Sequence, residues 1–422
     1  MPHRVVITGL GLITSIGIDQ ASVIRSLREL RHGFQRYEFL DNPELPVKVI
    51  GSVPEFDTEG VDAQAWTFPS RYPVNRETLR SLSPHGLYAH CSMLQAIEDA
   101  GLREGEVSNE ATGLYSASAG SPGVMHHYLS QMHRSGGRRN HPMGVVTTVS
   151  GTLHFNLCAF FHILGSACGF VSACSSSSHA LLYAAEDIRH GRQERMFVTG
   201  GEELMAETVL PFNGMRALST NPDPDRASRP FDVKRNGFVP TGGGVTMVLE
   251  SEEAARARGA RIYGELAGWA QASDGYHIAI PHPDGDGLRR TIELLFRQFD
   301  VAPAEVDYVN AHATSTLAGD LAEGRALDAV FGSRNCRPAI SSTKALTGHG
   351  LSLAGVAEAA FCALLLREGF IPGSAHIEEL DPAFANLDIV RESRDQAPAT
   401  ILSNSSGFGG GNVSLLLRRC PD

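Results

Sequence analysis

The segment best suited to covalent chemistry is GFVSACSSSSHALLYAAEDIRHG, residues 169–191, in which one cysteine precedes a run of serines. An apolar stretch ends at Ala173, and apolar residues recur with helical spacing from Ala180 onward. Cys174 is therefore predicted to lie where a strand passes into a helix. Unpaired N–H groups at a helix start lower a thiol pKa from about 8.5 and can bind an oxyanion. A buried structural cysteine is the alternative interpretation.

Two histidines could serve such a nucleophile. His312 lies in YVNAHATSTLAGDLAE and His349 in ISSTKALTGHG, each directly after an apolar strand candidate. Proteins of α/β type place their sites beyond the carboxyl ends of strands, and a nucleophilic cysteine needs a basic partner from elsewhere in the chain. Polar and charged residues surround both histidines: Thr314, Thr316, Asp320, Glu323, Lys344 and Thr347.

A fourth candidate segment is glycine-rich. In SNSSGFGGGN, residues 403–412, Gly407 and Gly409 flank Phe408. Glycines allow positive backbone angles and close approach of backbone amides to a bound group. A simple hairpin turn is the alternative interpretation.

The elements that must position these residues alternate between short strands and helices, which predicts the α/β class. The chain has 422 residues, more than one core usually accommodates. The charged segment ESEEAARARGAR, residues 250–261, is the best place to divide it. This gives an N-terminal half, 1–255, with the cysteine and a C-terminal half, 256–422, with both histidines. Predicted strands are 5–7, 113–116, 196–199, 245–249, 262–266, 308–311 and 413–417; predicted helices are 87–100, 178–191, 287–299 and 354–368.

Composition excludes several functions. The net charge of −11 and the lack of any Lys/Arg-rich run argue against a nucleic-acid or anionic-membrane surface. No stretch approaches the roughly 20 apolar residues of a membrane span. Seven cysteines without a Cys-x-x-Cys pair predict neither a metal site nor a disulfide framework, and favour the cytoplasm. The spacing of Gly9, Gly11 and Gly17 does not fit a dinucleotide-binding turn.

Taken together, SACSSSSHA, VNAHATST with Asp320 and Glu323, SSTKALTGH and SNSSGFGGGN resemble the β-ketoacyl-acyl-carrier-protein synthases of the thiolase superfamily. The resemblance covers essentially the whole chain and is strongest to synthase I of type II fatty acid synthesis. It implies a thiolase-like fold with two duplicated βαβαβαβ halves in a five-layer αβαβα arrangement. It also implies a homodimer.

The resemblance implies a decarboxylative condensation. Cys174 would take the acyl chain from an acyl carrier protein. Malonyl-carrier protein would then lose carbon dioxide, and the resulting enolate would attack the acyl-cysteine to give a 3-oxoacyl chain two carbons longer. No metal or resident cofactor is implied, because phosphopantetheine arrives on the carrier.

The resemblance also assigns roles to individual residues. The backbone amides of Cys174 and Phe408 would bind the acyl oxyanion, and neutral His312 and His349 would donate to the malonyl thioester oxygen. Lys344, paired with Glu323, would fix the histidine loop. The residues expected to contact substrate are Thr314, Thr316, Gly407 and Gly409.

Acyl carrier proteins are acidic, so a local basic patch is expected despite the negative net charge, because screening limits the reach of distant charges. Arg76 and Arg80 form one candidate patch, which Glu77 interrupts. Arg138 and Arg139 in HRSGGRR form the other. Docking is expected to depend mainly on the second patch.

Three residues depart from the family pattern: Ala313 replaces a usual Gly, Gly411 a usual Thr and Ser406 a usual Phe. These changes leave the chemistry intact but leave the substrate open. The alternative is a specialised type II polyketide or aryl-polyene ketosynthase, paired with a chain-length-factor-like subunit. A catalytically silent subunit is disfavoured because Cys174 and both histidines are present. A coenzyme A thiolase is disfavoured because Phe408 stands near the position of its second cysteine.

Overall fold

The computed structural model of the chain describes residues 2–332 and 336–420. Its strands form one hydrogen-bonded sheet in the order β11-β10-β9-β12-β13-β8-β1-β7-β6-β4-β5 and a small β2-β3 hairpin. The first half contributes β1 (Val5–Ile13), β2 (Phe34–Arg36), β3 (Val49–Gly51), β4 (Thr112–Ala117), β5 (Ala167–Phe170), β6 (Arg195–Glu202) and β7 (Gly243–Ser251). The second contributes β8 (Gly264–Ser273), β9 (Tyr308–Asn310), β10 (Ala339–Ser341), β11 (Asp388–Ile389), β12 (Thr400–Gly407) and β13 (Gly411–Arg418).

The pairing pattern shows the predicted duplication. In the first half β5, β4 and β6 run parallel, and β7 and β1 then continue antiparallel. In the second half β10, β9 and β12 run parallel, and β13 and β8 continue antiparallel. The two halves meet where β1 pairs with β8 through Val6 with Glu265 and Ile7 with Gly264.

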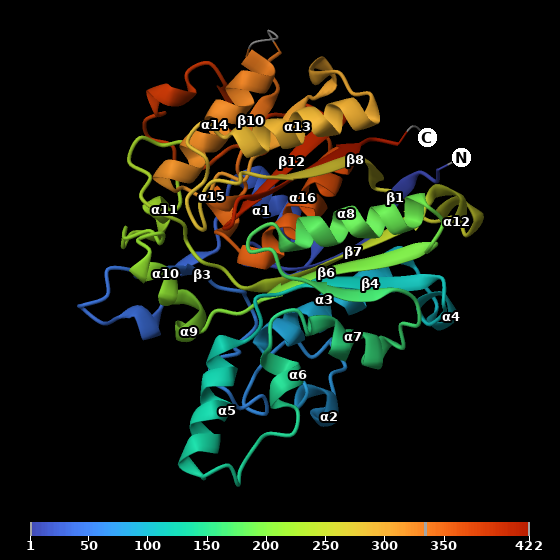
Figure 1. The fold of residues 1–422 in the computed structure, drawn as a ribbon, viewed down its shortest axis with the longest axis vertical. Helices are drawn as coiled ribbons and strands as arrows, with labels where there is room; N and C mark the ends of the chain where they lie inside the picture. Colours follow the sequence, from blue (N-terminus) through green and yellow to red (C-terminus); the bar gives the residue numbers. More distant parts are fainter. Residues whose placement is uncertain (1, 333–335, 421–422) are drawn as a thin grey trace.

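Helices complete five layers, as predicted from the resemblance. Between the two sheet halves lie α8 (Ser176–Arg189) and α16 (Ala354–Glu368), visible at the centre of Figure 1. The outer face of the first half is covered by α3 (Pro84–Ala100) and α7 (Leu153–Phe161). The outer face of the second half is covered by α13 (Asp286–Phe299) and α14 (Leu317–Phe331).

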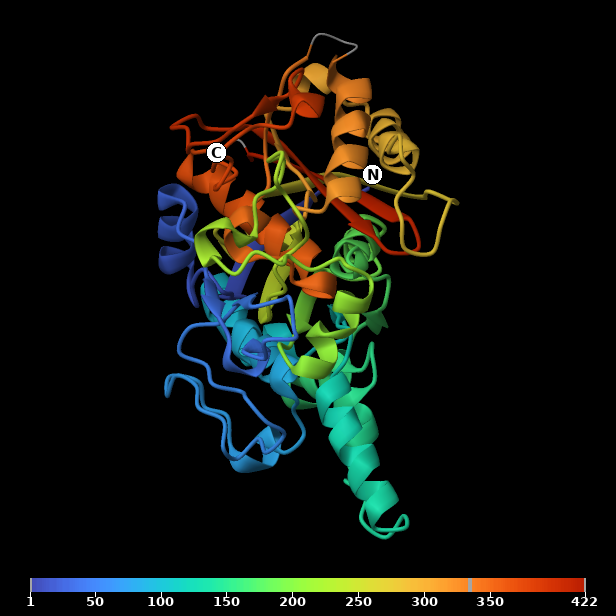
Figure 2. The same cartoon turned by 90° about the vertical axis from the view of Figure 1, so that its left-hand side faces the viewer.

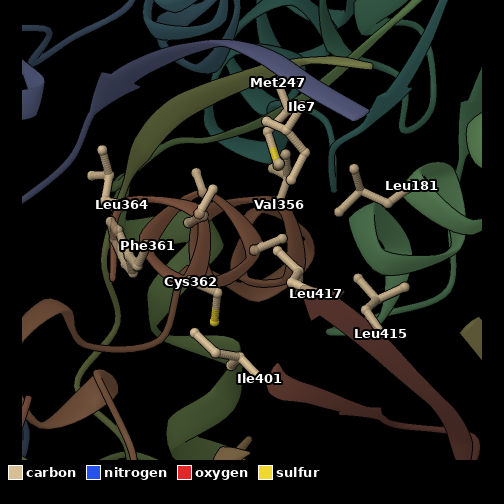
Figure 3. Packing of buried hydrophobic residues seen from close by; sticks show 14 of the residues in the cluster. Ile7, Leu181, Met247, Val356, Phe361, Cys362, Leu364, Ile401, Leu415 and Leu417 are labelled. Atoms are coloured by element: carbon tan, nitrogen blue, oxygen red, sulfur yellow. The ribbon is translucent and has the colours of Figure 1, made fainter. Parts of the chain in front are cut away.

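The central layer explains why the sequence of α16 is apolar on all sides. Every residue from 354 to 366 is buried, because this helix has a sheet on either side. Figure 3 shows Val356 of α16 beside Met247 and Ile7 of the first half, while Ile401 of the second half lies on the other side of the helix. The cysteine helix and the histidine-bearing segments are thereby held against one continuous core.

The remaining helices are short or peripheral. One of them, α5 (Pro122–Arg134), projects from the body with its following loop at the lower end of Figure 2. Among the described residues, no helix is long and apolar enough to cross a membrane. The other helices are α1 (Gln20–Glu29), α2 (Arg76–Leu79), α4 (Glu104–Val107), α6 (Gly144–Thr148), α9 (Ala206–Val209), α10 (Pro211–Gly214), α11 (Pro224–Ala227), α12 (Glu252–Ala257) and α15 (Lys344–Thr347).

The predicted strands and helices all recur, with shifted ends. The strand predicted at 262–266 begins at Gly264 and runs on to Ser273. The segment 219–230, a run of polar and turn-forming residues, enters the interior at its end. Ser228 and Arg229 are buried, because the Ser228 hydroxyl donates to the carbonyl of Lys344 and the Arg229 N–H donates to Ser315.

Candidate active site

Cys174 lies on a tight turn immediately before α8. Ala173 has a φ of 47°, a left-handed conformation that non-glycine residues rarely adopt. Ser176 stabilises the turn, since its hydroxyl accepts from the Ser172 N–H at 2.7 Å and donates to the Ala173 carbonyl at 2.6 Å. The predicted strand-to-helix junction is present, with the thiol at its apex.

The thiol of Cys174 is buried, with 8% of the residue exposed. Burial raises its pKa to about 12, although Lys344 and the backbone N–H groups of Phe408 and Cys174 act in the opposite direction. The expectation that the helix start lowers the pKa of Cys174 is therefore wrong. Desolvation of the thiolate outweighs the charge of Lys344 and the two backbone N–H groups.

The glycine-rich segment forms the turn between β12 and β13 and lies directly against the nucleophile. A Cβ atom on Gly407 would lie 2.9 Å from the Ser172 carbonyl oxygen and 3.2 Å from the Cys174 nitrogen. Only glycine permits this approach. It brings the N–H of Phe408 beside the sulfur together with the N–H of Cys174, the pair predicted to bind an oxyanion. Gly409, with a φ of 84°, continues the turn.

Both predicted histidines reach the cysteine's cavity. His312 follows β9, and His349 follows α15, where its N–H donates to the Val239 carbonyl at 2.7 Å. Their rings meet edge to face with centroids 5.3 Å apart. The pKa of each imidazole lies well below 6.5, chiefly because of burial and secondly because of the positive charge of Lys344. Both rings are therefore neutral at pH 7.

Glu323 positions the first histidine through the backbone. Its carboxylate accepts the N–H of His312 at 3.0 Å and the N–H of Ala313 at 2.7 Å. Asn404 of β12 donates to the same carboxylate at 3.3 Å. Glu323 thus fixes the loop after β9 in one place and ties it to the strand that leads into the glycine turn.

The resemblance implied an ion pair between Lys344 and Glu323, and this is wrong. The ammonium group of Lys344 instead contacts Glu358, on α16, and both side chains are buried. The carboxylate of Glu323 already accepts three hydrogen bonds, two of them from backbone N–H groups, so Glu358 is the available counterion. The charge of Lys344 still acts on the site: it adds to the lowering of the pKa of both His312 and His349, and it opposes the rise that burial causes in the pKa of Glu323.

A cavity of about 360 Å³ opens onto Cys174, His312 and His349. Thr314 and Thr316 lie in its wall with their hydroxyl oxygens 3.1 Å apart. Phe408 lies at its edge and is 37% exposed. The apolar part of the wall includes Phe212, Met215, Phe238, Ile280, Leu288 and Leu317. A largely apolar cavity with a thiol in its wall suits a long thioester arm better than a charged small molecule.

Ser406 also lines the cavity, and its surroundings were not predicted. Its hydroxyl donates to the Asn412 side-chain oxygen at 2.7 Å, and the Asn412 amide donates to Asp274 at 2.8 Å. Asp274 in turn accepts the His282 N–H at 2.9 Å. These bonds join the glycine turn to the loop between β8 and α13. The signal in the sequence was weak, because Asp274 is one of many polar loop residues.

The predicted docking arginines are exposed but lie on separate elements. Arg76 is the first residue of the short helix α2 and Arg80 follows its end. Arg138 and Arg139 lie in the loop beyond α5 that projects from the body in Figure 2. None of the four lines the cavity. They therefore belong to the outer surface.

Comparison with known families shows to which family the chain belongs. The description "Beta-ketoacyl synthase, N-terminal domain" matches residues 3–255, and "Beta-ketoacyl synthase, C-terminal domain" matches residues 263–378. The chain belongs to the β-ketoacyl synthase family, a family of condensing acyltransferases. This confirms the resemblance drawn from the four motifs.

Curated relatives and solved structures agree with this family assignment. The chain is 40% identical to 3-oxoacyl-[acyl-carrier-protein] synthase 1 of Escherichia coli K12 over 99% of this chain and 100% of that protein. It is 33% identical to synthase 2 of Coxiella burnetii over 100% and 99% of the respective chains. A β-ketoacyl synthase structure from Burkholderia phymatum superimposes with a TM-score of 0.90 at 33% identity, covering 99% and 100%. The ishigamide ketosynthase/chain length factor gives 0.87 at 28% identity, with both chains fully covered.

Proposed function

We propose that the protein is a β-ketoacyl-acyl-carrier-protein synthase that extends acyl chains by two carbons in fatty acid biosynthesis. The observation that carries this proposal is the convergence of Cys174, His312 and His349 on one cavity, with the Phe408 N–H beside the sulfur. A nucleophile, two neutral imidazoles and a backbone donor pair are what two successive carbonyl reactions require.

In the first half-reaction Cys174 attacks the acyl thioester carbonyl. Because its pKa is about 12, the thiol is protonated in the resting protein. Its proton therefore leaves as the carbon–sulfur bond forms and is passed to the departing carrier thiolate, so that the carrier leaves as a free thiol. The N–H groups of Cys174 and Phe408 stabilise the tetrahedral oxyanion.

In the second half-reaction malonyl-carrier protein occupies the vacated cavity. We assign His312 and His349 as hydrogen-bond donors to its thioester oxygen. When carbon dioxide departs, the negative charge of the enolate develops on this oxygen and is stabilised by the two N–H groups. The enolate carbon then attacks the acyl-cysteine, and the cysteine sulfur departs. Thr314 and Thr316 contact the pantetheine arm. No resident cofactor enters these steps, because phosphopantetheine arrives on the carrier.

The test is product formation from purified components. The protein would be incubated with an acyl carrier protein loaded with a medium saturated chain and with malonyl-carrier protein, and products would be read by intact mass. We expect a 3-oxoacyl carrier protein two carbons longer, absent with Cys174→Ala and retained with Cys168→Ala. Failure of the unmodified protein with carriers that a known synthase accepts would overturn the proposal.

We also propose that the protein works as a homodimer. The edge strand β5 pairs only with β4 among the described strands, and an open edge is a template for a second strand. Exposed apolar side chains surround it, including Phe155, Leu164 and Val171. Sedimentation should give a dimer that Leu164→Asp with Val171→Asp dissociates and Ile278→Asp, a change at another exposed apolar site, does not. A monomeric unmodified protein would refute this.

One observation favours a second candidate, a specialised type II polyketide or aryl-polyene ketosynthase with a chain-length-factor-like partner. The cavity wall carries Ser406 where the resemblance leads us to expect a bulky aromatic. A ketosynthase solved with its type II PKS acyl-carrier protein and the ishigamide ketosynthase/chain length factor share the fold. Turnover of saturated, polyunsaturated and aryl acyl-carrier proteins would decide between the two. Preference for medium saturated chains supports fatty acid synthesis, and preference for aryl or polyene chains supports the alternative. A cytoplasmic location stays a prediction from the cysteine pattern.

A further inference from the structure

One buried carboxyl group behind the active site has no role in the steps above. Glu202 ends β6, and none of it is exposed. Its Oε1 accepts the Ala119 N–H at 3.0 Å, the Ser352 N–H at 3.2 Å and the Ser352 hydroxyl. Its Oε2 is buried and has no hydrogen-bond partner within the described part of the chain. A group held by three donors on one oxygen is placed with precision.

The segment that Glu202 contacts carries the second histidine. Ser352 is the middle residue of a 3-10 turn, Leu351–Leu353, that follows His349 after one glycine. Leu351 has a φ of 48°, a strained value for a leucine, and it lines the cavity beside the nucleophile. Such a backbone persists only where neighbouring contacts hold it. The two donors of Ser352 to Glu202 are contacts of that kind.

The position of the His349 imidazole depends on this backbone. Its Nδ1 is buried and makes no hydrogen bond to any described residue, so no second group fixes the ring through that atom. The ring is held by edge-to-face packing on Phe238, with centroids 5.2 Å apart, and on His312. Its main chain is fixed on one side by Val239 and Thr241. On the other side the fixed point is Ser352.

We propose that Glu202 is a positioning residue that grips Ser352 and thereby sets the place of the His349 imidazole for the condensation step. The inference rests on the proposed function, because it assigns Glu202 to one half-reaction of that function. Removing the contact between Glu202 and Ser352 should therefore slow decarboxylation and condensation, which need His349 as a donor. Acylation of Cys174 should change less, because the turn and helix of Cys174 are held by other hydrogen bonds.

The charge of Glu202 gives the proposal a second, independent consequence. Burial raises its pKa to about 8, and its negative charge, when present, raises the pKa of Cys174. The other titratable groups facing this region are Glu203, which is next in the chain and raises the pKa of Glu202, and His85, 3.9 Å from the Glu203 carboxylate. At pH 7 Glu202 is therefore mostly neutral. It accepts the hydrogen bonds from Ser352 without placing a negative charge near the Cys174 thiol.

The experiment separates the two half-reactions in four variants of the full-length protein. Glu202→Gln keeps an acceptor oxygen for Ser352, whereas Glu202→Ala and Ser352→Ala remove the contact wholly or partly. Glu203→Gln is the matched control, because Glu203 is equally buried but accepts from Ser121 and Thr208 instead. Acylation of Cys174 by acyl-carrier protein and decarboxylation of malonyl-carrier protein would be timed for each.

We expect Glu202→Ala to slow decarboxylation and condensation about tenfold or more while acylation stays within about threefold. Ser352→Ala should also slow condensation more than acylation, but by a smaller factor. Glu202→Gln and Glu203→Gln should have rates close to those of the unmodified protein. An equal fall in both half-reactions, or the same split in Glu203→Gln, would overturn the proposal. Because Glu202→Gln and Ser352→Ala are small changes, the result does not depend on the alanine variant folding.

Alkylation of Cys174 by iodoacetamide tests the charge without any carrier substrate. Glu202→Gln should react at the unmodified rate at pH 6.5 and about threefold faster or more at pH 9.5, because only the unmodified protein acquires the negative charge in between. If the ratio of the alkylation rate of Glu202→Gln to that of the unmodified protein did not change with pH, this would contradict the proposed effect of the Glu202 charge on Cys174. This readout stands even if the protein proves inactive with acyl carriers, so failure of the inference and failure of the proposed function are distinguishable.

Discussion

The imidazole rings of His312 and His349 meet edge to face, with centroids 5.3 Å apart and planes at 88°. They come from different loops of the C-terminal half, yet both line the cavity above Cys174 of the N-terminal half. Burial and the charge of Lys344 keep both rings neutral, so each has one N–H to donate. This pair is the structural basis of the proposed decarboxylation.

Replacing either histidine should therefore separate the two half-reactions. In His312→Ala we expect condensation to fall about 10²–10³-fold, the usual cost of removing one oxyanion donor, while acylation of Cys174 persists. His349→Ala should lose condensation to a similar extent. Single-turnover mass spectrometry would measure both steps, with His190→Ala, an exposed histidine at the end of α8, as the control. Equal loss of acylation and condensation in His312→Ala would contradict its assignment.

The reactivity of Cys174 should rise with pH without levelling off. Because burial raises its pKa to about 12, only a small thiolate fraction exists at neutral pH. The rate of alkylation by iodoacetamide should climb about tenfold per pH unit up to pH 8 and show no plateau by pH 9.5. Cys174→Ala supplies the background from other cysteines. A plateau below pH 8 would mean that the helix terminus overrides burial.

The buried pair of Lys344 and Glu358 makes a prediction about stability. Lys344→Met leaves Glu358 buried without a counterion, and breaking such a pair costs about 3–5 kcal/mol of unfolding free energy. Lys344→Met with Glu358→Leu should recover most of this loss, since the charges leave together. Chemical denaturation of both variants would measure the difference. A double variant no more stable than the single one would show that the ion pair itself stabilises the fold.

The close approach of Gly407 to the nucleophile predicts a specific glycine requirement. In Gly407→Ala the new methyl group would meet the Ser172 carbonyl oxygen and the Cys174 nitrogen, and the turn must move away. Displacing the Phe408 N–H by about 1 Å should slow acylation about 10²-fold. Gly105→Ala on α4 is the control, because its Cβ would meet nothing within 4 Å. Unchanged acylation would remove this donor from the mechanism.

The exposed arginines beyond α5 should matter only for substrates on a carrier. Arg138→Glu with Arg139→Glu should raise KM for acyl-carrier protein about tenfold at low salt, with kcat and the KM for acyl-pantetheine unchanged. Added salt should reduce the difference, since screening weakens charge steering. The same reversal at Arg76 and Arg80 should have a smaller effect because exposed Glu77 lies between them. No change in KM for the carrier would exclude the second patch as a docking surface.

The sequence identified the residues of the site because each is next to a local signal. Cys174 follows an apolar run and precedes helical spacing, and both histidines follow strands. The pKa of Cys174 was not predictable in this way. Its direction depends on how deeply neighbouring elements bury the thiol, which no local pattern records.

The partner of Lys344 was missed for a related reason. Glu358 is the one acidic residue within the apolar run of α16 before Glu368, and a charge in a buried helix needs a counterion. That signal was present in the sequence, but the ion pair joins α15 to α16, and only the tertiary structure brings them together. Glu202 was missed likewise, because it lies in an apolar strand end and its role depends on Ser352, 150 residues later.

The duplicated topology could be predicted only through the family resemblance. The two halves share pairing order and sense without a repeat that is visible in the sequence. The burial of Ser228 and Arg229 could not be predicted from the sequence either. These polar residues are buried because they form hydrogen bonds to Lys344 and Ser315. In both cases the deciding contacts are distant in the chain.

The central claim is that Cys174 carries the growing acyl chain between the two half-reactions. The most direct measurement is the intact mass of the protein after incubation with acyl-carrier protein, before and after malonyl-carrier protein is added. We predict one acyl group per chain, located on Cys174 by peptide mapping and discharged as 3-oxoacyl carrier protein by the second addition. A protein that forms product with no acyl group on Cys174, or whose adduct lies on another residue, would contradict the account.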